Sequence, residues 1–199
     1  MLPMWKRTLT RKVQRIFWIY LHYDFVINSM NDFKTTDAGV RCRFVPVTVD
    51  NYCRVREFRE EQRITEYREK HRNGEVGFFA ECDGRLVGSI WATINRTRVR
   101  SVVRMYMPLM PNEALIHDIV TAESFRGMGV GPFMVSRMAL QLLSEYGVNR
   151  IIIDVSSRNR PSLRMMEKVG LEAREKVFSV SLFSTLAYHK TLRTLSHAL

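Results

Sequence analysis

One short stretch carries the residue types that suit a phosphate site: Arg126, Gly127, Met128, Gly129, Val130 and Gly131. An apolar, strand-like run precedes it, and an amphipathic, helix-like run follows it. Three glycines let the backbone turn tightly and let a ligand approach closely. The amides that open a helix have no partner within it, and the helix dipole adds partial positive charge there. The stretch therefore predicts a site for an anionic phosphate group.

Known phosphate-loop patterns narrow the choice of ligand. A dinucleotide fingerprint needs a third glycine where Pro132 or Met134 stands, and no Gly-Lys-Ser/Thr follows as in a mononucleotide loop. The remaining pattern, Arg-x-x-Gly-x-Gly, resembles the pyrophosphate signature of the GCN5-related N-acetyltransferase (GNAT) superfamily. On these six residues alone, a Gly-rich turn without a ligand stays the alternative.

A second segment supports the same resemblance. Residues 159–171 begin with Asn159, carry Ser162 three residues on, and end with Lys-Val-Gly-Leu, which resembles the second motif of the family. The gap from Gly131 to Asn159 accommodates one helix and one strand, as the family requires. The resemblance extends over roughly residues 40–183.

The resemblance implies an α/β fold with a central, mostly antiparallel sheet, in which a splayed parallel strand pair is flanked by helices. It also implies acetyl-CoA as co-substrate, with the pyrophosphate on the amides of residues 126–131. The pantetheine arm is expected along the main chain of Ile119 and Val120. From the second motif, Asn159 and Ser162 are expected to fix the same arm.

Acyl transfer to an amine needs a proton acceptor, because an alkyl ammonium has a pKa of about 10. In the family an acidic base often lies on the strand before the Gly-rich turn. Here that strand carries His117 and Asp118, and Glu113 stands just before it. Successive strand residues point to opposite faces, so at most one of His117 and Asp118 is expected to face the cleft. We favour His117, because an unperturbed histidine side chain changes its charge at about pH 6.5 and can act as a base at neutral pH. The alternative is a structural His117, with water taking the proton.

The resemblance predicts an acetyl-CoA-dependent N-acetyltransferase that acts on a primary amine of a small molecule, such as an amino sugar of polysaccharide biosynthesis. A protein or peptide amine is the alternative within this class. A non-catalytic acyl-CoA-binding module is the other alternative. The reason for this alternative is Met166, which stands where many members have a tyrosine that protonates the leaving thiolate. Methionine cannot donate a proton.

Composition bounds the class of protein. The 199 residues, 46% hydrophobic, suffice for one domain with a sizeable core. The formal net charge is +11, and residues 1–23 supply +5 of it, with five basic and no acidic residues. Such a balance suits nucleic acid, a membrane or an anionic ligand. Without an Arg-rich run or an RNA-binding signature we expect no nucleic-acid partner.

Three scattered cysteines bear on compartment and metal binding. Cys42, Cys53 and Cys82 form no CxxC pair and no metal-ligand spacing. We therefore expect reduced cysteines, no metal site and a cytoplasmic protein.

The chain is expected to have three regions. A basic amphipathic helix in residues 1–30 and a linker fill residues 1–39, the acetyltransferase domain fills 40–183, and a tail of weak helical character fills 184–199. The longest apolar run in the helix, Ile16–Leu21, is too short to span a membrane. Two roles stay open for the helix: peripheral contact with the inner membrane surface, or packing on the body or on a second copy in a homodimer.

Hydrophobic periodicity places the elements that must position the site. Strands are expected at residues 41–49, 76–80, 85–95, 114–120, 151–155 and 172–182, and helices at 52–58, 62–71, 132–146 and 162–169. Asp83-Gly84 predicts a hairpin turn. Two prolines near the end of residues 96–112 predict a strand extension followed by an irregular loop.

Overall fold

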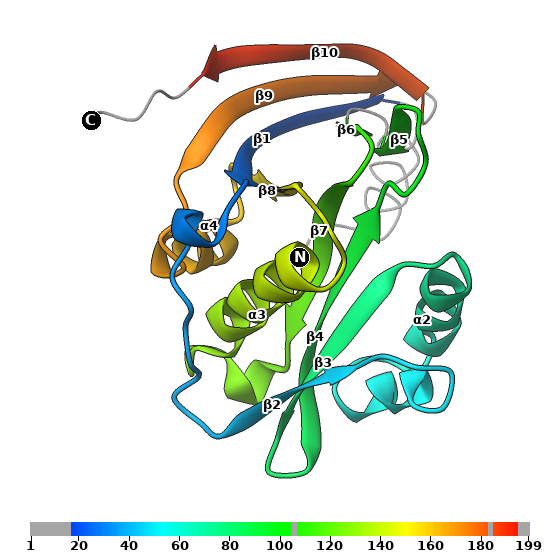
Figure 1. Ribbon diagram of the computed structural model, residues 1–199, viewed down its shortest axis with the longest axis vertical. Coiled ribbons are helices and arrows are strands. Elements are labelled where there is room, and N and C mark those ends of the chain that lie inside the picture. The colour runs from blue at the N-terminus through cyan, green and yellow to red at the C-terminus, as the bar shows by residue number, and fades with distance from the viewer. Residues whose placement is uncertain (1–16, 105–106, 183–184, 195–199) are drawn as a thin grey trace, which may run out of the picture.

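One mixed β-sheet organises the chain (Figure 1). The computed structural model describes residues 17–104, 107–182 and 185–194. From one edge to the other, the eight strands are β10 (Thr185–Thr194), β9 (Ala173–Leu182), β1 (Phe17–Ile27), β8 (Arg150–Ser156), β7 (Glu113–Thr121), β4 (Arg85–Ile94), β3 (Val76–Cys82) and β2 (Cys42–Pro46). Within these residues β7 and β8 run parallel and the other neighbours antiparallel. The predicted fold class is confirmed.

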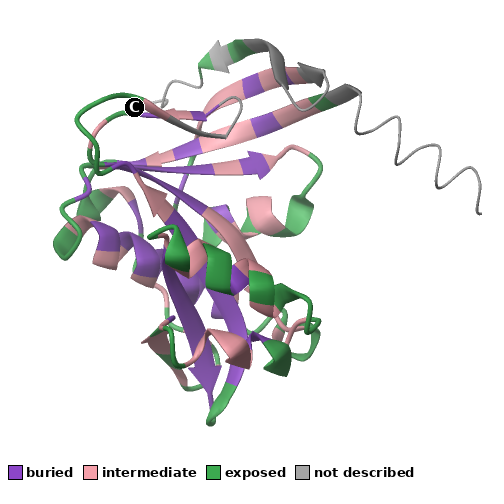
Figure 2. Cartoon of the chain, turned by 90° about the vertical axis from the view of Figure 1, so that its right-hand side faces the viewer, coloured by how far each residue is buried: buried purple, intermediate pink, exposed green. Residues whose placement is uncertain are grey.

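Two helical layers cover opposite faces of this sheet. The elements outside it are η1 (Met30–Asp32), η2 (Tyr52–Glu57), α2 (Arg63–Arg72), β5 (Ser101–Arg104), β6 (Met107–Leu109), η3 (Glu123–Phe125), α3 (Val130–Ser144) and α4 (Arg160–Lys168). Side chains alternate along the central strands: Phe78 and Ile90 join the core under α3 and α4, whereas Phe79 and Trp91 join the core under η2 and α2. Figure 2 shows buried residues running along these strands.

Residues 96–112 form a structure of their own. Instead of an irregular loop, they contain a separate two-stranded hairpin of β5 and β6. Met107 and Leu109 of β6 pack on Leu115 of β7 and Ile152 of β8. A proline is tolerated in β6 because a two-stranded hairpin leaves one edge of each strand unpaired. The hairpin thus covers β7 and β8 where they pair.

Local turn chemistry holds as predicted between β3 and β4. Asp83 and Gly84 both have positive φ, 50° and 78°, which suits a tight hairpin turn. The helices predicted at 62–71, 132–146 and 162–169 correspond to α2, α3 and α4 within a few residues. No helix in the described ranges is both long enough and apolar enough to cross a membrane.

The N-terminal helix prediction is wrong for residues 17–27. They form β1, which lies between β8 and β9 and pairs antiparallel with both. Phe25 and Ile27 are buried in the main core, so pairing and burial outweigh the local helical spacing. Residues 1–16 lie outside the described residues. Strand β1 is therefore part of the same sheet as β7, the strand that precedes the Gly-rich turn, and not part of a separate leader.

The weak helical character predicted for residues 184–199 is also overturned in the described part of that tail. Residues 185–194 form β10, which pairs antiparallel with β9 at the edge of the sheet. A ready strand edge offers backbone hydrogen bonds along the whole segment, whereas an isolated short helix is marginal in water.

The prediction of three reduced cysteines is wrong for two of them. Cys42 and Cys82 form a disulfide, and Cys53 is free. The two bonded residues stand directly opposite each other on β2 and β3, with their Cα atoms 4.4 Å apart. Strand pairing creates this proximity, and a sequence separation of 40 residues hides it.

The place of β1 in the sheet can be tested by stability. We expect Ile27→Ala to lower the free energy of unfolding by about 2–5 kcal/mol, because the side chain is fully buried. Ile19→Ala on the same strand is the matched control: this side chain is 57% exposed, and a loss of about 1 kcal/mol or less is expected. Urea unfolding measures both. Equal losses would contradict the assignment.

Candidate functional site

The site is a gap between two strands that begin as a pair. β7 and β8 are paired from Glu113 with Arg150 to Ile116 with Ile153, and beyond that point β7 stays with β4 while β8 stays with β1. A bulge starts the divergence. Asp118 and Ile119 together lie opposite the single residue Ile90 of β4, and Asp118 has a φ of 46°.

The larger of two cavities at this gap has a volume of about 570 Å³. It lies between the end of β7, the Gly-rich turn and the start of α4. Its lining residues are Ile119, Val120, Thr121, Phe125, Arg126, Gly127, Gly129, Val130, Gly131, Pro132, Asn159, Pro161, Ser162, Arg164, Met165 and Lys168. The structure thus gathers the residues predicted for the co-substrate, except Met128. The Met128 carbonyl instead accepts a hydrogen bond from Gly39, at 2.8 Å.

The Gly-rich turn has the backbone that its glycines permit. Gly127 and Gly129 have φ values of 85° and 80°, a region that other residues rarely adopt. α3 begins directly after Gly129, and its first intrahelical hydrogen bond runs from Phe133 N to Gly129 O, at 3.0 Å. The amides of Gly127, Gly129, Val130 and Gly131 are available to a ligand, whereas those of Arg126 and Met128 donate to the carbonyls of Glu123 and Phe125, and Pro132 has none. This geometry fits an anionic phosphate group.

Side-chain charge around the larger cavity points the same way. Arg126, Arg164 and Lys168 line it, and no acidic side chain is among its described lining residues. Asn159 caps α4, because its Oδ1 accepts the Ser162 amide at 3.2 Å. The amide-rich turn, the helix start and three cations therefore surround one space.

A smaller cavity of about 180 Å³ adjoins the first. Its lining residues are Tyr20, Ile116, His117, Asp118, Ile119, Ile153, Asp154, Val155, Ser156, Asn159, Ser162 and Met165. Ile119, Asn159, Ser162 and Met165 line both cavities, so the two meet at the mouth of the strand gap. A long ligand in the larger cavity would reach a second ligand in the smaller one.

The bulge overturns the expectation that His117 and Asp118 point to opposite faces. His117 Nε2 lies 3.1 Å from Glu75 Oε2 and 3.0 Å from Thr93 Oγ1. Asp118 contacts Arg59 and Lys70, so both side chains point toward the layer of η2 and α2. The left-handed conformation of Asp118 breaks the strand alternation that the prediction assumed.

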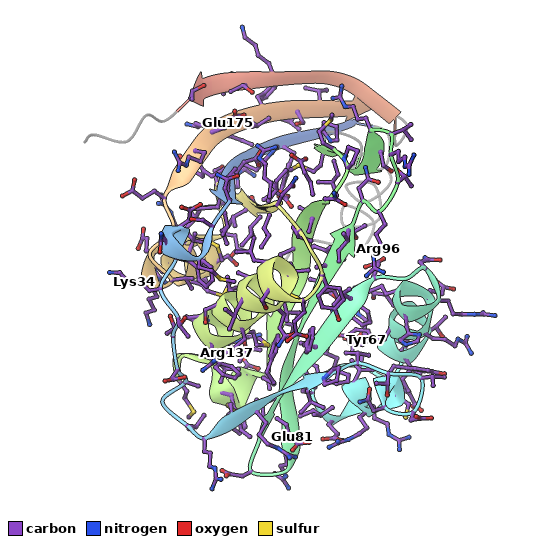
Figure 3. The ribbon with its side chains drawn as sticks, viewed as in Figure 1. Lys34, Tyr67, Glu81, Arg96, Arg137 and Glu175 are labelled. Atoms are coloured by element: carbon purple, nitrogen blue, oxygen red, sulfur yellow. A yellow bond between two sulfur atoms is a disulfide. The ribbon has the colours of Figure 1, made fainter. Side chains whose placement is uncertain are left out.

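Asp118 is held ionised by its neighbours. Burial disfavours the charged form, but the Lys70 hydrogen bond and the charges of Lys70 and Arg59 outweigh it and lower the pKa of Asp118 below its usual value. Arg59 Nη1 lies 3.1 Å from both carboxylate oxygens. Figure 3 labels Tyr67, whose hydroxyl accepts a bond from Arg59. A carboxylate so tightly paired is a weak proton acceptor and a strong anchor for the bulge.

Glu113 lies at the other end of β7, where β7 and β8 still pair. Its side chain accepts a hydrogen bond from Arg150 at 3.0 Å and another from the Met110 amide at 2.9 Å. It lines neither of the two cavities. The geometry therefore separates Glu113 from the other predicted catalytic residues.

α4 presents a different methionine to the gap from the one that the motif suggests. Met166 is fully buried in the main core, whereas Met165 lines both cavities. Neither side chain donates a proton.

Four further ionisable side chains that line the two cavities are not among the sequence candidates. Arg164 and Lys168 lie about one helical turn apart on one exposed side of α4. Tyr20 comes from β1 and Asp154 from β8. Polar residues at every second position of β1, Tyr20, His22 and Asp24, are the signal that would have indicated a strand with one polar face.

The sequence profile of the Acetyltransferase (GNAT) family matches residues 46–171. The match covers more than half of the chain and includes both motifs, so the chain belongs to the GNAT acetyltransferase family. No protein of curated function matches the sequence.

Solved structures show the same fold. A GCN5-related glucosamine N-acetyltransferase region of a fungal multi-domain β-N-acetylglucosaminidase has a TM-score of 0.58 at 14% identity, over 88% of this chain and 22% of that one. A GNAT-family acetyltransferase from Colwellia psychrerythraea has a TM-score of 0.59 at 12% identity, over 88% and 60%. AAC(6′)-Iy, bound to the bisubstrate analogue CoA-S-monomethyl-acetylneamine, has a TM-score of 0.52 at 17% identity, over 66% and 91%. The chain spans less than two thirds of the first two proteins.

Asp118→Asn tests the anchor of the bulge. Asparagine adopts the left-handed conformation as aspartate does, so the change removes charge with little backbone strain. We expect a loss of about 2–4 kcal/mol near neutral pH, because Arg59 and Lys70 lose a partly buried counter-ion. The lowered pKa of Asp118 means that this stability is present above the unfolded value of about 3.9 and is lost as the pH falls through the folded value.

Asp83→Asn is the control for that experiment, because Asp83 is exposed and also has a positive φ, of 50°. Urea unfolding between pH 3 and pH 7 compares the two variants. If the difference in unfolding free energy between wild type and Asp118→Asn stayed constant over this pH range, the ionic anchor would be refuted.

Proposed function

We propose that this chain transfers an acetyl group from acetyl-CoA to the primary amine of a small molecule. One observation carries the proposal: a cation-lined cavity at the Gly-rich turn opens, through the gap between β7 and β8, into a small cavity that contains carboxylates. The first suits a polyanionic co-substrate, and the second suits a cationic amine. Membership of the GNAT family supports the reaction class.

The co-substrate fits the larger cavity in two parts. The unpaired amides of the Gly-rich turn, at Gly127, Gly129, Val130 and Gly131, suit the pyrophosphate. The side chains of Arg126, Arg164 and Lys168 add positive charge around it. The main chain of Ile119 and Val120 has lost β8 as a neighbour, because pairing ends at Ile116. That free strand edge suits the amide groups of the pantetheine arm.

The acceptor belongs to the smaller cavity, and we propose an amino sugar or a related small amine. A volume of about 180 Å³ suits one compact group better than a folded protein surface. Two structural relatives support this class: one is a glucosamine N-acetyltransferase region, and the other was solved with an acetylneamine analogue. The cytoplasmic location, the homodimer and the membrane contact through residues 1–30 stay predictions from the sequence.

A non-catalytic acyl-CoA-binding module is the second candidate. The observation in its favour is that α4 offers Met165 to the gap and buries Met166, so neither methionine supplies a proton to the thiolate where many family members have a tyrosine. A thiol such as that of coenzyme A leaves readily as thiolate, so the lack of a donor slows transfer rather than forbids it. Binding and turnover measurements separate the two candidates.

Acetyl-CoA binding is tested first by thermal unfolding. Ligand at 100 times its Kd stabilises the native state by about 2.7 kcal/mol, which corresponds to a rise in Tm of about 5–10 °C for a chain of this size. We expect Gly127→Glu to abolish the rise, because it places bulk and negative charge at the phosphate position. Gly127 suits this test better than Gly129, at which a Cβ would lie 3.4 Å from Ala38 Cα.

Gly84→Glu is the matched control. Both Gly127 and Gly84 have positive φ, and a Cβ at either meets no atom within 4 Å, but Gly84 lies in the β3–β4 turn outside both cavities. The control should keep the full rise in Tm. If Gly127→Glu kept it as well, the pyrophosphate site would be misplaced.

Turnover is tested by following thiol release from acetyl-CoA in the presence of glucosamine, neamine or lysine. We expect amine-dependent release with an amino sugar at a rate above that with lysine, because the small cavity favours a compact cation. Mass spectrometry of the product identifies the acetylated amine. Acetyl-CoA binding without release for any of the three amines would instead support the binding module.

A further inference from the structure

Strands β1 and β8 bring two groups to the smaller cavity that neither motif of the family includes. Tyr20 of β1 and Asp154 of β8 both line this cavity, and the Tyr20 hydroxyl donates to Asp154 Oδ2 at 3.3 Å. Residues 46–171, which match the family profile, do not contain Tyr20. The pair joins residues that are 134 positions apart in the chain.

We propose that Asp154 binds the ammonium group of the acceptor and takes its proton, and that Tyr20 protonates the thiolate that leaves. This inference rests on the proposed function and names the acid and the base for it. Both groups touch the space in which the amine and the thioester would meet.

The other carboxylates of the predicted site are committed elsewhere. Asp118 is paired with Arg59 and Lys70, and Glu113 lies outside both cavities. Asp154 lines the smaller cavity from β8, beyond the last residue of β8 that pairs with β7.

Neighbouring acids make the Asp154 wall attractive to a cation. Asp24 of β1 stands directly opposite Asp154 on one side and opposite Glu175 of β9 on the other, so the three carboxylates share one face across three strands. Figure 3 labels Glu175 on β9. An incoming ammonium ion relieves the repulsion within this row, which is a gain that a neutral acceptor does not provide.

Asp24 does not line the cavity, but its charge changes the electrostatic field at Asp154. Burial, followed by the charges of Asp154 and Glu175, raises the pKa of Asp24 to about 7, while Arg150 opposes the rise. His22 of the same strand also faces it, with Nε2 3.3 Å from Asp24 Oδ1. Above pH 7 the ionised Asp24 strengthens the negative field at Asp154, and below pH 7 the field weakens.

Tyr20 supplies the phenol hydroxyl that the methionines of α4 do not provide. Met165 of α4 lines the same cavity as Tyr20 and cannot donate a proton. A phenol hydroxyl can donate to a thiolate and can recover its proton from a neighbouring acid.

The proposed step balances as follows in atoms and charge. Asp154 accepts one proton from the ammonium, and the neutral amine then attacks the carbonyl carbon of the thioester. As the N–C bond forms and the C–S bond breaks, the sulfur takes the electron pair and a proton from Tyr20. Tyr20 recovers a proton from Asp154 through their hydrogen bond, and the second amine proton leaves to water.

Two variants test the assignment with acetyl-CoA and neamine as probes. We expect Asp154→Asn to weaken neamine binding to the CoA-saturated protein at least tenfold by calorimetry, and to lower kcat/KM by about 10²–10⁴-fold. We expect Tyr20→Phe to lower kcat at least tenfold while neamine affinity stays unchanged. Both variants should keep the acetyl-CoA-dependent rise in Tm, which shows that the fold and the co-substrate site are intact.

Matched controls make the same chemical changes outside the site. Glu167→Gln removes an exposed carboxylate of α4, and Tyr146→Phe removes a hydroxyl that lies outside both cavities. Both should leave kcat and neamine affinity unchanged. Asp24→Asn adds a readout that a merely structural role would not move: the rise in neamine affinity as the pH passes through about 7, where Asp24 gains its charge, should disappear in this variant.

Each outcome decides one assignment. Full neamine affinity and full rate in Asp154→Asn, or loss of activity in His117→Ala but not in Asp154→Asn, would overturn Asp154 as the base. Full rate in Tyr20→Phe would overturn the acid, and a wild type that binds neither neamine nor glucosamine would overturn the acceptor site. No rise in Tm with acetyl-CoA in the wild type would instead refute the proposed function itself.

Discussion

The loss of pairing between β7 and β8 is the constraint on which the rest of the site depends. Parallel strands that have paired from Glu113 to Ile116 would normally continue to do so, because each lost backbone hydrogen bond needs a replacement. The left-handed Asp118 bends β7 away, and Arg59 and Lys70 hold that residue in place by ion pairs. Both cavities exist because the strands part at this point, and a ligand with amide groups can take the place of the missing strand partner.

Opposite charges at the two ends of the gap give the site its direction. On the side of α3 and α4, backbone amides and three cationic side chains surround a space without acids among its described lining residues. On the side of β1 and β8, Asp154 lines the smaller cavity and Asp24 stands next to it in the sheet. Under the proposed function, an anionic thioester carrier and a cationic amine would therefore meet from opposite sides at the shared residues Ile119, Asn159, Ser162 and Met165. The net charge of +11 alone does not reveal this separation.

Strand β1 contributes both to the hydrophobic core and to the lining of the smaller cavity. Its apolar face, through Phe25 and Ile27, helps to bury the core under α3 and α4, while its polar face presents Tyr20 and Asp24 beside Asp154. The alternation of a strand is what allows one segment to do both. The disulfide between Cys42 and Cys82 joins β2 to β3 at the other side of the sheet, away from the gap.

The sequence by itself determined the features that depend on local backbone chemistry. Local backbone conformation sets the turn at 126–131, the Asn159 cap and the Asp83-Gly84 hairpin. The spacing of the two motifs was enough to predict the family and the residues that line the larger cavity. Tertiary structure alone decided that residues 17–27 form a strand, that Cys42 meets Cys82, and that a bulge turns His117 and Asp118 to one side. It also brought Tyr20 to Asp154. The physical reason is that sheet pairing between distant segments sets these contacts, and spacing along one segment carries no record of its partner strand.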